Sequence, residues 1–365
     1  MKQDINLIEL AKKLEVNKAK KKDIVLSTDR LTLEKSITNN DLAFGINSDE
    51  MPSSQLAISD VAHTQIASHL DIPKRYYDKM RFEDNQSLLK ENIKHWFEKN
   101  PKPRMLRLFD EGKNELTGIE KYTCRAFLSD KYKRIDNELI AEGALPALQE
   151  MPNVQIKSCS LTDKNMYIKA VLPQLSAIVK EGDVVQSGLL IRNSEVGFGA
   201  VEVSMLVYRL VCDNGLVVQD GSTRKTHIGT KLSESYDLLS TETLIADAQT
   251  LKLAIRDIVK NTANEVLFLS NVKKMKELSE SSEMNKPNES IKILAKQYGL
   301  AENEQEGVLA SLIKGGDLTA WGMLNAVTDY SKKADSYERA TELERIGGKI
   351  LDLNPSQWKV LQEVA

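Results

Sequence analysis

The chain has 365 residues, a net charge of −3 and only 5% aromatic residues, so we expect either one large core with a helical appendage or two domains. The near-balanced charge neither requires nor excludes nucleic acid, because phosphate binding depends on Lys and Arg being clustered on one face. Three widely spaced cysteines, Cys124, Cys159 and Cys212, argue against a disulfide framework or a zinc site, and the lack of a long apolar run argues against export and membrane insertion.

The N-terminal part of the chain predicts a helix, two short strands and a longer helical segment. Residues 1–25 carry seven Lys against four acids and an apolar stripe at helical spacing, so they form either a basic arm or a solvated capping helix. Two short strands are expected within 28–46. Residues 57–100 are expected to be helical, and 64–73 have the spacing of a helix-turn-helix whose second helix covers 74–79. Simple packing of two amphipathic helices explains the same spacing.

The segment 99–134 concentrates positive charge, with ten Lys and Arg against five Asp and Glu, whereas 277–306 carries three Lys against seven Glu. Two strands are expected in the basic segment, at 104–109 and 121–128, joined by a polar connection that contains glycine. If these strands pair, much of the positive charge lies on one β-hairpin.

Alternation along the two strands predicts that Arg107 and Phe109 share a face, as do Arg125 and Phe127. The hairpin would then present a basic and aromatic strip, in which guanidinium groups meet successive phosphates while rings stack on bases. The residues expected to bind phosphates are Arg104, Arg107, Arg125, Lys131, Lys133 and Arg134, and those expected to stack are Phe127 or Tyr132. The alternative is that the rings belong to the core and the arginines pair with acids of the sheet.

A helix is expected from Asn137 to about Gly143, with Pro146 opening another turn. Beyond it the sequence predicts strands at 154–161, 166–172, 189–193, 200–212 and 216–219. We expect the last three strands to form the nucleus of the fold. The strand 200–212 should be exposed on one face at its start and buried on both faces later, and the dipeptide Asn214-Gly215 favours a tight hairpin.

A polar loop at 220–227 is rich in small residues, and its backbone N–H groups together with Arg224 and Lys225 could hold a phosphate. It lacks a Walker motif, and a solvated loop explains it as well. Arg192 and Arg209 are further candidates for phosphate binding. Because Arg209 interrupts an apolar strand face, we expect a structural carboxylate beside it.

From Thr241 onward the pattern is helical, with a polar linker at 277–287 and three or four short helices in 288–365. The fold class expected is therefore α+β: a curved antiparallel β-sheet with flanking helices, plus a C-terminal all-helical region. The expected division of the chain is an N-terminal arm with short strands at 1–56, an α+β core domain at 57–240 and a helical region at 241–365.

The sequence offers no compelling catalytic motif. The four histidines, His63, His69, His95 and His227, do not form a metal-binding or nucleophile-activating pattern, and the carboxylates are scattered. We expect no enzymatic activity, no metal and no cofactor. Acids brought together by folding remain the alternative.

Several segments in a fixed order carry a family resemblance: TQIASHLDIPKRYY, RAFLSDKYKRIDN, GDVVQSG, NSEVGFGAVEV, YRLVCDNGLV and LTAWGMLNAVTDY. Over about residues 55–330 the chain resembles phage and plasmid-like proteins classed as a domain of unknown function. That resemblance implies a mobile-element origin and no accepted activity. The lack of a signal-peptide core and of a long apolar run predicts a cytoplasmic location, here that of the bacterial host. In architecture the chain is also similar to Rad-type single-strand annealing proteins, which implies a curved antiparallel sheet followed by helices, ring assembly and a basic groove for single-stranded DNA.

The resulting hypothesis is a single-stranded DNA-binding accessory protein of a phage or plasmid, with strand annealing as an extension of that activity. Its expected partners are single-stranded DNA and further copies of itself, with a ring as one arrangement, and no membrane. One alternative is a protein-interaction module that uses the acidic helical C-terminus to bind a host or phage partner. The other is a metal-dependent nuclease.

Overall fold

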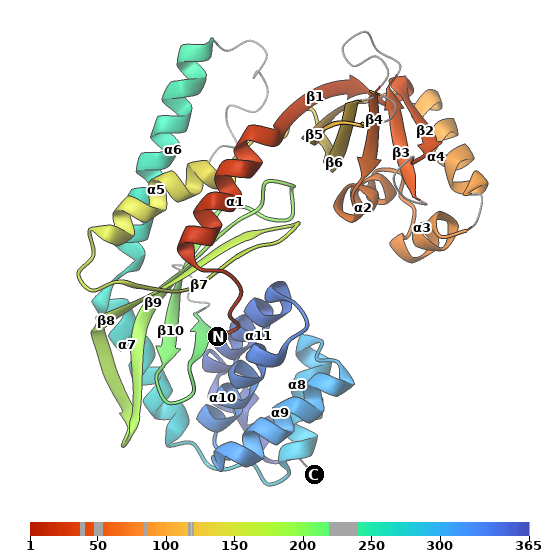
Figure 1. Ribbon diagram of the computed structural model, residues 1–365. Coiled ribbons are helices and arrows are strands. Elements are labelled where there is room, and N and C mark those ends of the chain that lie inside the picture. The colour runs from red at the N-terminus through yellow and green to blue at the C-terminus, as the bar shows by residue number, and fades with distance from the viewer. Residues whose placement is uncertain are drawn as a thin grey trace.

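The computed structural model describes residues 1–36, 41–46, 54–83, 86–115, 118, 120–218 and 240–364. Two β-sheets dominate it, each covered by helices, and a cluster of helices forms the C-terminal part (Figure 1). The expected α+β class, with a curved antiparallel sheet, flanking helices and a helical C-terminal region, is confirmed.

The first sheet belongs to what we call the N-terminal unit, residues 21–129. Its strands are β1 (Lys21–Ser27), β2 (Leu31–Lys35), β3 (Leu42–Ile46), β4 (Ser54–Ile58), β5 (Pro103–Lys113) and β6 (Glu120–Ser129). They lie in the order β1-β5-β6-β4-β3-β2, and only β4 and β6 run parallel to each other. The sheet therefore contains strands from both sides of residue 56, where the sequence suggested a domain boundary.

Three helices cover one face of this sheet (Figure 1): α2 (Asp60–His69), α3 (Lys74–Arg81) and α4 (Ser87–Lys99). The core between them contains Phe44, Leu56, Ile66, Tyr77 and Phe97. Helices α2 and α3 occupy the expected helix-turn-helix positions. The expectation of helix throughout 57–100 is thus confirmed, apart from the end of β4 and the turns.

The helix α1 (Leu7–Lys20) links the two halves of the molecule, because β1 follows it directly. Leu10 and Leu14 of α1 are buried against α5 (Asn137–Gln149), so the capping-helix interpretation of the N-terminus is confirmed. The expectation that Pro146 opens a new turn is wrong, because α5 continues through it.

The second sheet forms the core unit with α5, and it is entirely antiparallel in the order β11-β10-β9-β8-β7. Its strands are β7 (Gln155–Leu161), β8 (Met166–Lys180), β9 (Asp183–Asn193), β10 (Glu202–Arg209) and β11 (Asn214–Val217). On one face, α1, α5 and α6 (Thr241–Thr262) pack over residues such as Ile168 and Leu189. These strands lie where the sequence places them, although β8 and β9 are longer and β10 is shorter than expected. The expected hairpin turn at Asn214-Gly215 is wrong, because both residues belong to β11 and pair with Arg209 and Tyr208.

The remaining helices are α7 (Glu265–Ser279), α8 (Pro287–Tyr298), α9 (Glu302–Gly315), α10 (Ala320–Tyr330), α11 (Tyr337–Leu351) and α12 (Pro355–Gln362). Tyr337 of α11 packs against Tyr167 and Leu190 of the second sheet. Because α11 lies over this face, the start of β10 is not exposed as expected. Glu202 is buried there and accepts hydrogen bonds of 2.6 and 2.9 Å from Arg345.

Candidate functional site

The hairpin of β5 and β6 carries most of the residues that the sequence singled out, and a β-bulge decides where they point. Arg107 pairs with Ala126, whereas the next residue, Leu108, pairs with Cys124, so Arg125 is an extra residue on β6. A bulge of this kind shifts the alternation of side chains by one position. The prediction that Arg125 and Phe127 share a face is therefore wrong.

Phe127 points into the N-terminal unit, where it is 3% exposed and its ring stacks on that of Phe97 at 5.8 Å. Arg125 points to the opposite face, toward the core unit, with its guanidinium carbon 3.9 Å from the ring centroid of Phe109. Phe127 is thus a core residue rather than a platform for a base.

Arg107 is enclosed at the junction of the two units, with only 1% of its surface exposed. Its guanidinium donates to Asp23 at 3.1 Å, to Asp136 at 2.6 Å and to the backbone oxygen of Glu195 at 2.9 Å. Burial alone would lower the pKa of Arg107, but Asp136 and Asp23 raise it above its usual value. Four of the five N–H groups of Arg107 are thus engaged inside the protein, and burial keeps the side chain away from an external phosphate.

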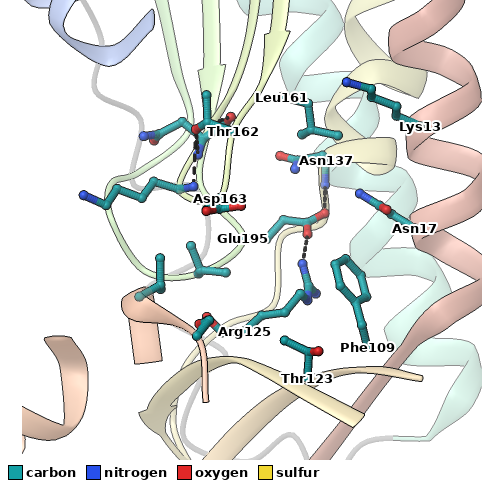
Figure 2. Close-up of a pocket in the computed structure, with 15 residues that line it drawn as sticks. Lys13, Asn17, Phe109, Thr123, Arg125, Asn137, Leu161, Thr162, Asp163 and Glu195 are labelled. Atoms are coloured by element: carbon teal, nitrogen blue, oxygen red, sulfur yellow. Dashed lines mark hydrogen bonds and ion pairs between the residues drawn. The ribbon is translucent and has the colours of Figure 1, made fainter. Parts of the chain in front are cut away.

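Glu195, in the loop after β9, holds the junction together from the core unit. Its carboxylate accepts hydrogen bonds from Arg125 at 2.8 Å and from the backbone N–H of Asn137 at 2.7 Å (Figure 2). It also accepts one from Lys21. Burial opposes ionisation, but Lys21 and Arg125 keep the pKa of Glu195 below its usual value. The basic strip expected from the sequence thus exists in part, but it faces carboxylates inside the molecule.

The other end of the hairpin, where β5 begins, lies away from this junction. Arg104, near the start of β5, is half-buried, and its Nη2 lies 2.5 Å from Nδ1 of His69. Its buried Nε has no hydrogen-bond partner, and no ion pair to Arg104 occurs within the described part of the chain. Burial lowers the pKa of Arg104, and Asp130 offsets this only in part. Arg104 is therefore a cation without a bonded carboxylate.

The pKa of His69 reflects the positive charge around Arg104. Burial, followed by repulsion from Arg104 and Lys102, lowers the pKa of His69 to about 4. The imidazole is therefore neutral at physiological pH, and its Nδ1 can accept the hydrogen bond from Arg104. Lys102 itself is exposed.

The end of α4 adds an aromatic ring and a further cation to this region. Trp96 is 45% exposed, and Nζ of Lys99 lies 4.9 Å from its ring centroid. Lys131 is exposed two residues beyond Ser129, the residue that pairs with Arg104 across the sheet. The basic patch is hereafter the set Trp96, Lys99, Lys102, Arg104 and Lys131.

The sequence predicted Arg104 and Lys131 but missed Trp96, Lys99 and Lys102. The excess of positive charge, which begins at Lys99, was a signal that could have found the two lysines. The chain itself keeps these lysines near Arg104, because only residues 100–102 separate the end of α4 from the start of β5, whereas the exposure of Trp96 beside Lys99 follows only from the fold.

The remaining expected site residues lie elsewhere. Tyr132 donates from its hydroxyl to the backbone oxygen of Ser194 at 3.2 Å, and Lys133 pairs with Asp247 at 2.8 Å. Arg134 remains 44% exposed, 3.6 Å from Asp23. Arg224 and Lys225 lie outside the described residues.

Two further arginines of the core unit are engaged within the protein. Arg192 donates to Asn165 at 3.0 Å and to the backbone oxygen of Phe198 at 2.9 Å. Arg209 binds both carboxylate oxygens of Asp183 at 2.7 Å, so the structural carboxylate expected beside it is confirmed.

The described ranges contain neither a metal-binding cluster nor a helix suited to a membrane. No group of three or more His, Cys, Asp and Glu side chains there is placed to hold a metal ion. None of the helices in these ranges has both the length and the apolar character needed to cross a membrane.

No curated protein and no solved structure matches the chain. A family model described as Domain of unknown function (DUF932) matches residues 126–347, which is more than half of the chain and includes the second sheet together with α5 to α10 and most of α11. The chain therefore belongs to the DUF932 family.

Proposed function

We propose that the protein binds single-stranded DNA through the basic patch, as an accessory protein of a phage or plasmid. The observation that carries the proposal is Arg104, whose guanidinium is bonded to a neutral histidine while Arg107 and Arg125 on the same hairpin are bonded to carboxylates. A cation that is not neutralised inside the protein keeps its charge for an external phosphate.

The chemistry of the patch suits a single strand better than a duplex. Trp96 is 45% exposed and offers indole surface on which any base can stack in place of Lys99, at about 1–3 kcal/mol per base. Lys99, Lys102 and Lys131 are compact, exposed charges that suit backbone phosphates rather than base edges. This combination favours binding with little sequence preference.

The test is fluorescence anisotropy of a labelled oligo-dT, titrated with salt, on the wild type and on Lys102→Gln/Arg104→Gln. We expect micromolar or tighter binding at low salt, weakened at least about tenfold in the double variant. The log–log salt slope should fall by about 0.7 for each phosphate that the variant no longer neutralises. The matched control is Arg256→Gln/Lys260→Gln, which removes two exposed cations of α6 that pair with Glu150.

Tryptophan fluorescence gives an independent readout, because Trp321 and Trp358 are buried and Trp96 is the exposed one of the three. Binding of oligo-dT should quench the fluorescence of Trp96, and this quenching should be absent in Trp96→Leu. No binding of oligo-dT at low salt, or the same salt slope in both double variants, would contradict the proposal.

Strand annealing and ring assembly extend the proposal. Both require that several copies present their patches to one strand. Light scattering with and without oligo-dT measures assembly, and the rate at which complementary strands pair measures annealing. Neutral substitutions of Arg107 or Arg125 are unsuitable as tests of DNA binding, since removing one partner of a buried ion pair costs about 3–5 kcal/mol of stability.

A further inference from the structure

A cavity of about 440 Å³ lies between the N-terminal unit and the core unit, apart from the basic patch (Figure 2). Its walls come from α1, the β5–β6 hairpin, the start of α5, the β7–β8 turn and the loop after β9. The volume falls within the range of about 300–1,000 Å³ that is usual for small-molecule sites.

The guanidinium of Arg125 lines this cavity with unsatisfied hydrogen-bond donors. Its Nη1 donates to Glu195 at 2.8 Å, but its Nε and Nη2 are buried and have no partner. Buried donors on a charged group are rarely left unpaired, and an anion bound at this point would satisfy both of them. The half-buried ring of Phe109 covers the guanidinium, so this ring must move before a ligand can reach the two donors.

The charge around the cavity favours an anion. Lys13 and Lys164 are exposed at its wall, and neither forms an ion pair within the part of the chain that is described. Two acids also line it, Asp163 and Glu195, and Glu195 pairs with Arg125 and with Lys21, which Asp136 and Glu138 share. The three cations of the lining therefore face two carboxylates, which leaves a formal charge of +1.

The neutral groups of the lining define the rest of the ligand. Asn17 supplies an amide, which suits a hydroxyl group of a sugar better than an apolar body, whereas the hydroxyls of Ser59 and Thr162 already donate to the backbone oxygen of Arg125 and to Glu338. The ring of Phe109 is the aromatic surface of the cavity.

We propose that this cavity binds a small phosphate monoester of the size of a nucleoside monophosphate, with Nε and Nη2 of Arg125 donating side by side to two phosphate oxygens. Such a fork matches the geometry of a phosphate group, which a lysine ammonium cannot reproduce. The proposal is independent of DNA binding at the basic patch.

Isothermal titration calorimetry of the full chain tests it with three probes: inorganic phosphate, adenosine 5′-monophosphate and acetate. We expect the nucleotide to bind more tightly than phosphate, and phosphate more tightly than acetate. Arg125→Lys, which keeps the charge beside Glu195 but loses the fork, should weaken nucleotide binding by about 10–100-fold, as expected for a charge-assisted hydrogen bond. Arg256→Lys, on the exposed face of α6, is the matched control and should bind like the wild type.

A second variant covers the case in which Arg125→Lys does not fold. Lys13→Gln/Lys164→Gln changes two exposed side chains and leaves the Arg125–Glu195 pair intact; it should weaken binding by about two- to fivefold for each charge removed. No heat with any probe, unchanged affinity in both variants, or acetate binding as tightly as phosphate would overturn the proposal. Lys102→Gln/Arg104→Gln should retain nucleotide binding, which separates this site from the basic patch.

Discussion

Glu195 connects the two halves of the molecule through its carboxylate. Its carboxylate is 5% exposed and joins β1, β6 and α5 through Lys21, Arg125 and the N–H of Asn137. A buried carboxylate is tolerated only where it is paired and hydrogen-bonded, so these three donors are a condition for the loop after β9 to fold as it does.

His63 is a second buried ionisable residue, in the core of the N-terminal unit. It is fully buried, and its Nδ1 lies 2.8 Å from the hydroxyl of Tyr77. Burial and then Arg81 lower the pKa of His63 to about 3, although Asp41 and Asp60 oppose this. The folded protein therefore keeps His63 neutral in mildly acidic solution.

This pKa predicts a loss of stability between pH 7 and pH 5. The unfolded chain, in which histidine has a pKa of about 6.5, takes up a proton that folded His63 does not, so acidification favours unfolding by about 2 kcal/mol from His63 alone. The measurement is urea unfolding at both pH values. His63→Gln should remove that part of the loss, whereas exposed His95→Gln should retain it. An unchanged pH dependence in His63→Gln would show that His63 is not the cause.

At the scale of elements, β9 is the central strand of the second sheet and pairs with β8 on one side and β10 on the other. Gly188 lies in its middle, opposite Val171 and Leu206. A Cβ atom at Gly188 would lie 2.4 Å from the backbone oxygen of Ala170. Neighbouring strands approach each other there more closely than any side chain permits.

We therefore expect Gly188→Ala to destabilise the protein by about 1–3 kcal/mol, because the strands must separate to accept the methyl group. The matched control is Gly315→Ala at the end of α9, where a Cβ would meet no atom within 4 Å. Denaturant unfolding of the two variants measures the difference. Equal stability of Gly188→Ala and Gly315→Ala would mean that the sheet relaxes freely at this point.

At the scale of the whole molecule, the C-terminal helices share their core with the second sheet. Val185, Met205 and Val207 pack in one cluster with Trp321 and Leu343 of α10 and α11. Lys169 of β8 forms a fully buried ion pair with Glu344 of α11 at 2.6 Å. The helices are thus part of the fold that holds the sheet, although their sequence pattern is typical of a separate region.

A chain that ends at residue 286 should accordingly fail to fold cooperatively. The truncation removes α8 to α12, exposes the apolar cluster and leaves Lys169 without its carboxylate, and the loss of such a partner is costly. Near-ultraviolet circular dichroism and size-exclusion chromatography, with the full chain as reference, test this. A soluble 1–286 chain with a sharp unfolding transition would show instead that the helices are dispensable.

Local patterns in the sequence were enough to identify most strands and helices, because strand alternation, helical stripes and turn residues need no information from distant segments. They predicted the strands of the second sheet, the β5–β6 hairpin and the helical C-terminus, and they anticipated a carboxylate beside Arg209. They could not predict the register of the hairpin. The bulge at Arg125 depends on how the two strands pair, and it produces no recognisable periodicity in the sequence of either strand.

Which cations are free depends instead on the tertiary structure. Arg104, Arg107 and Arg125 look alike in the sequence, yet two are neutralised by Asp23, Asp136 and Glu195, acids that β1, α5 and the loop after β9 bring to the junction. The third, Arg104, forms no ion pair within the described part of the chain, and the charge of Asp130 offsets the effect of its burial only in part. The net charge of a surface depends on partners distant in sequence, so the candidate site could not follow from local pattern.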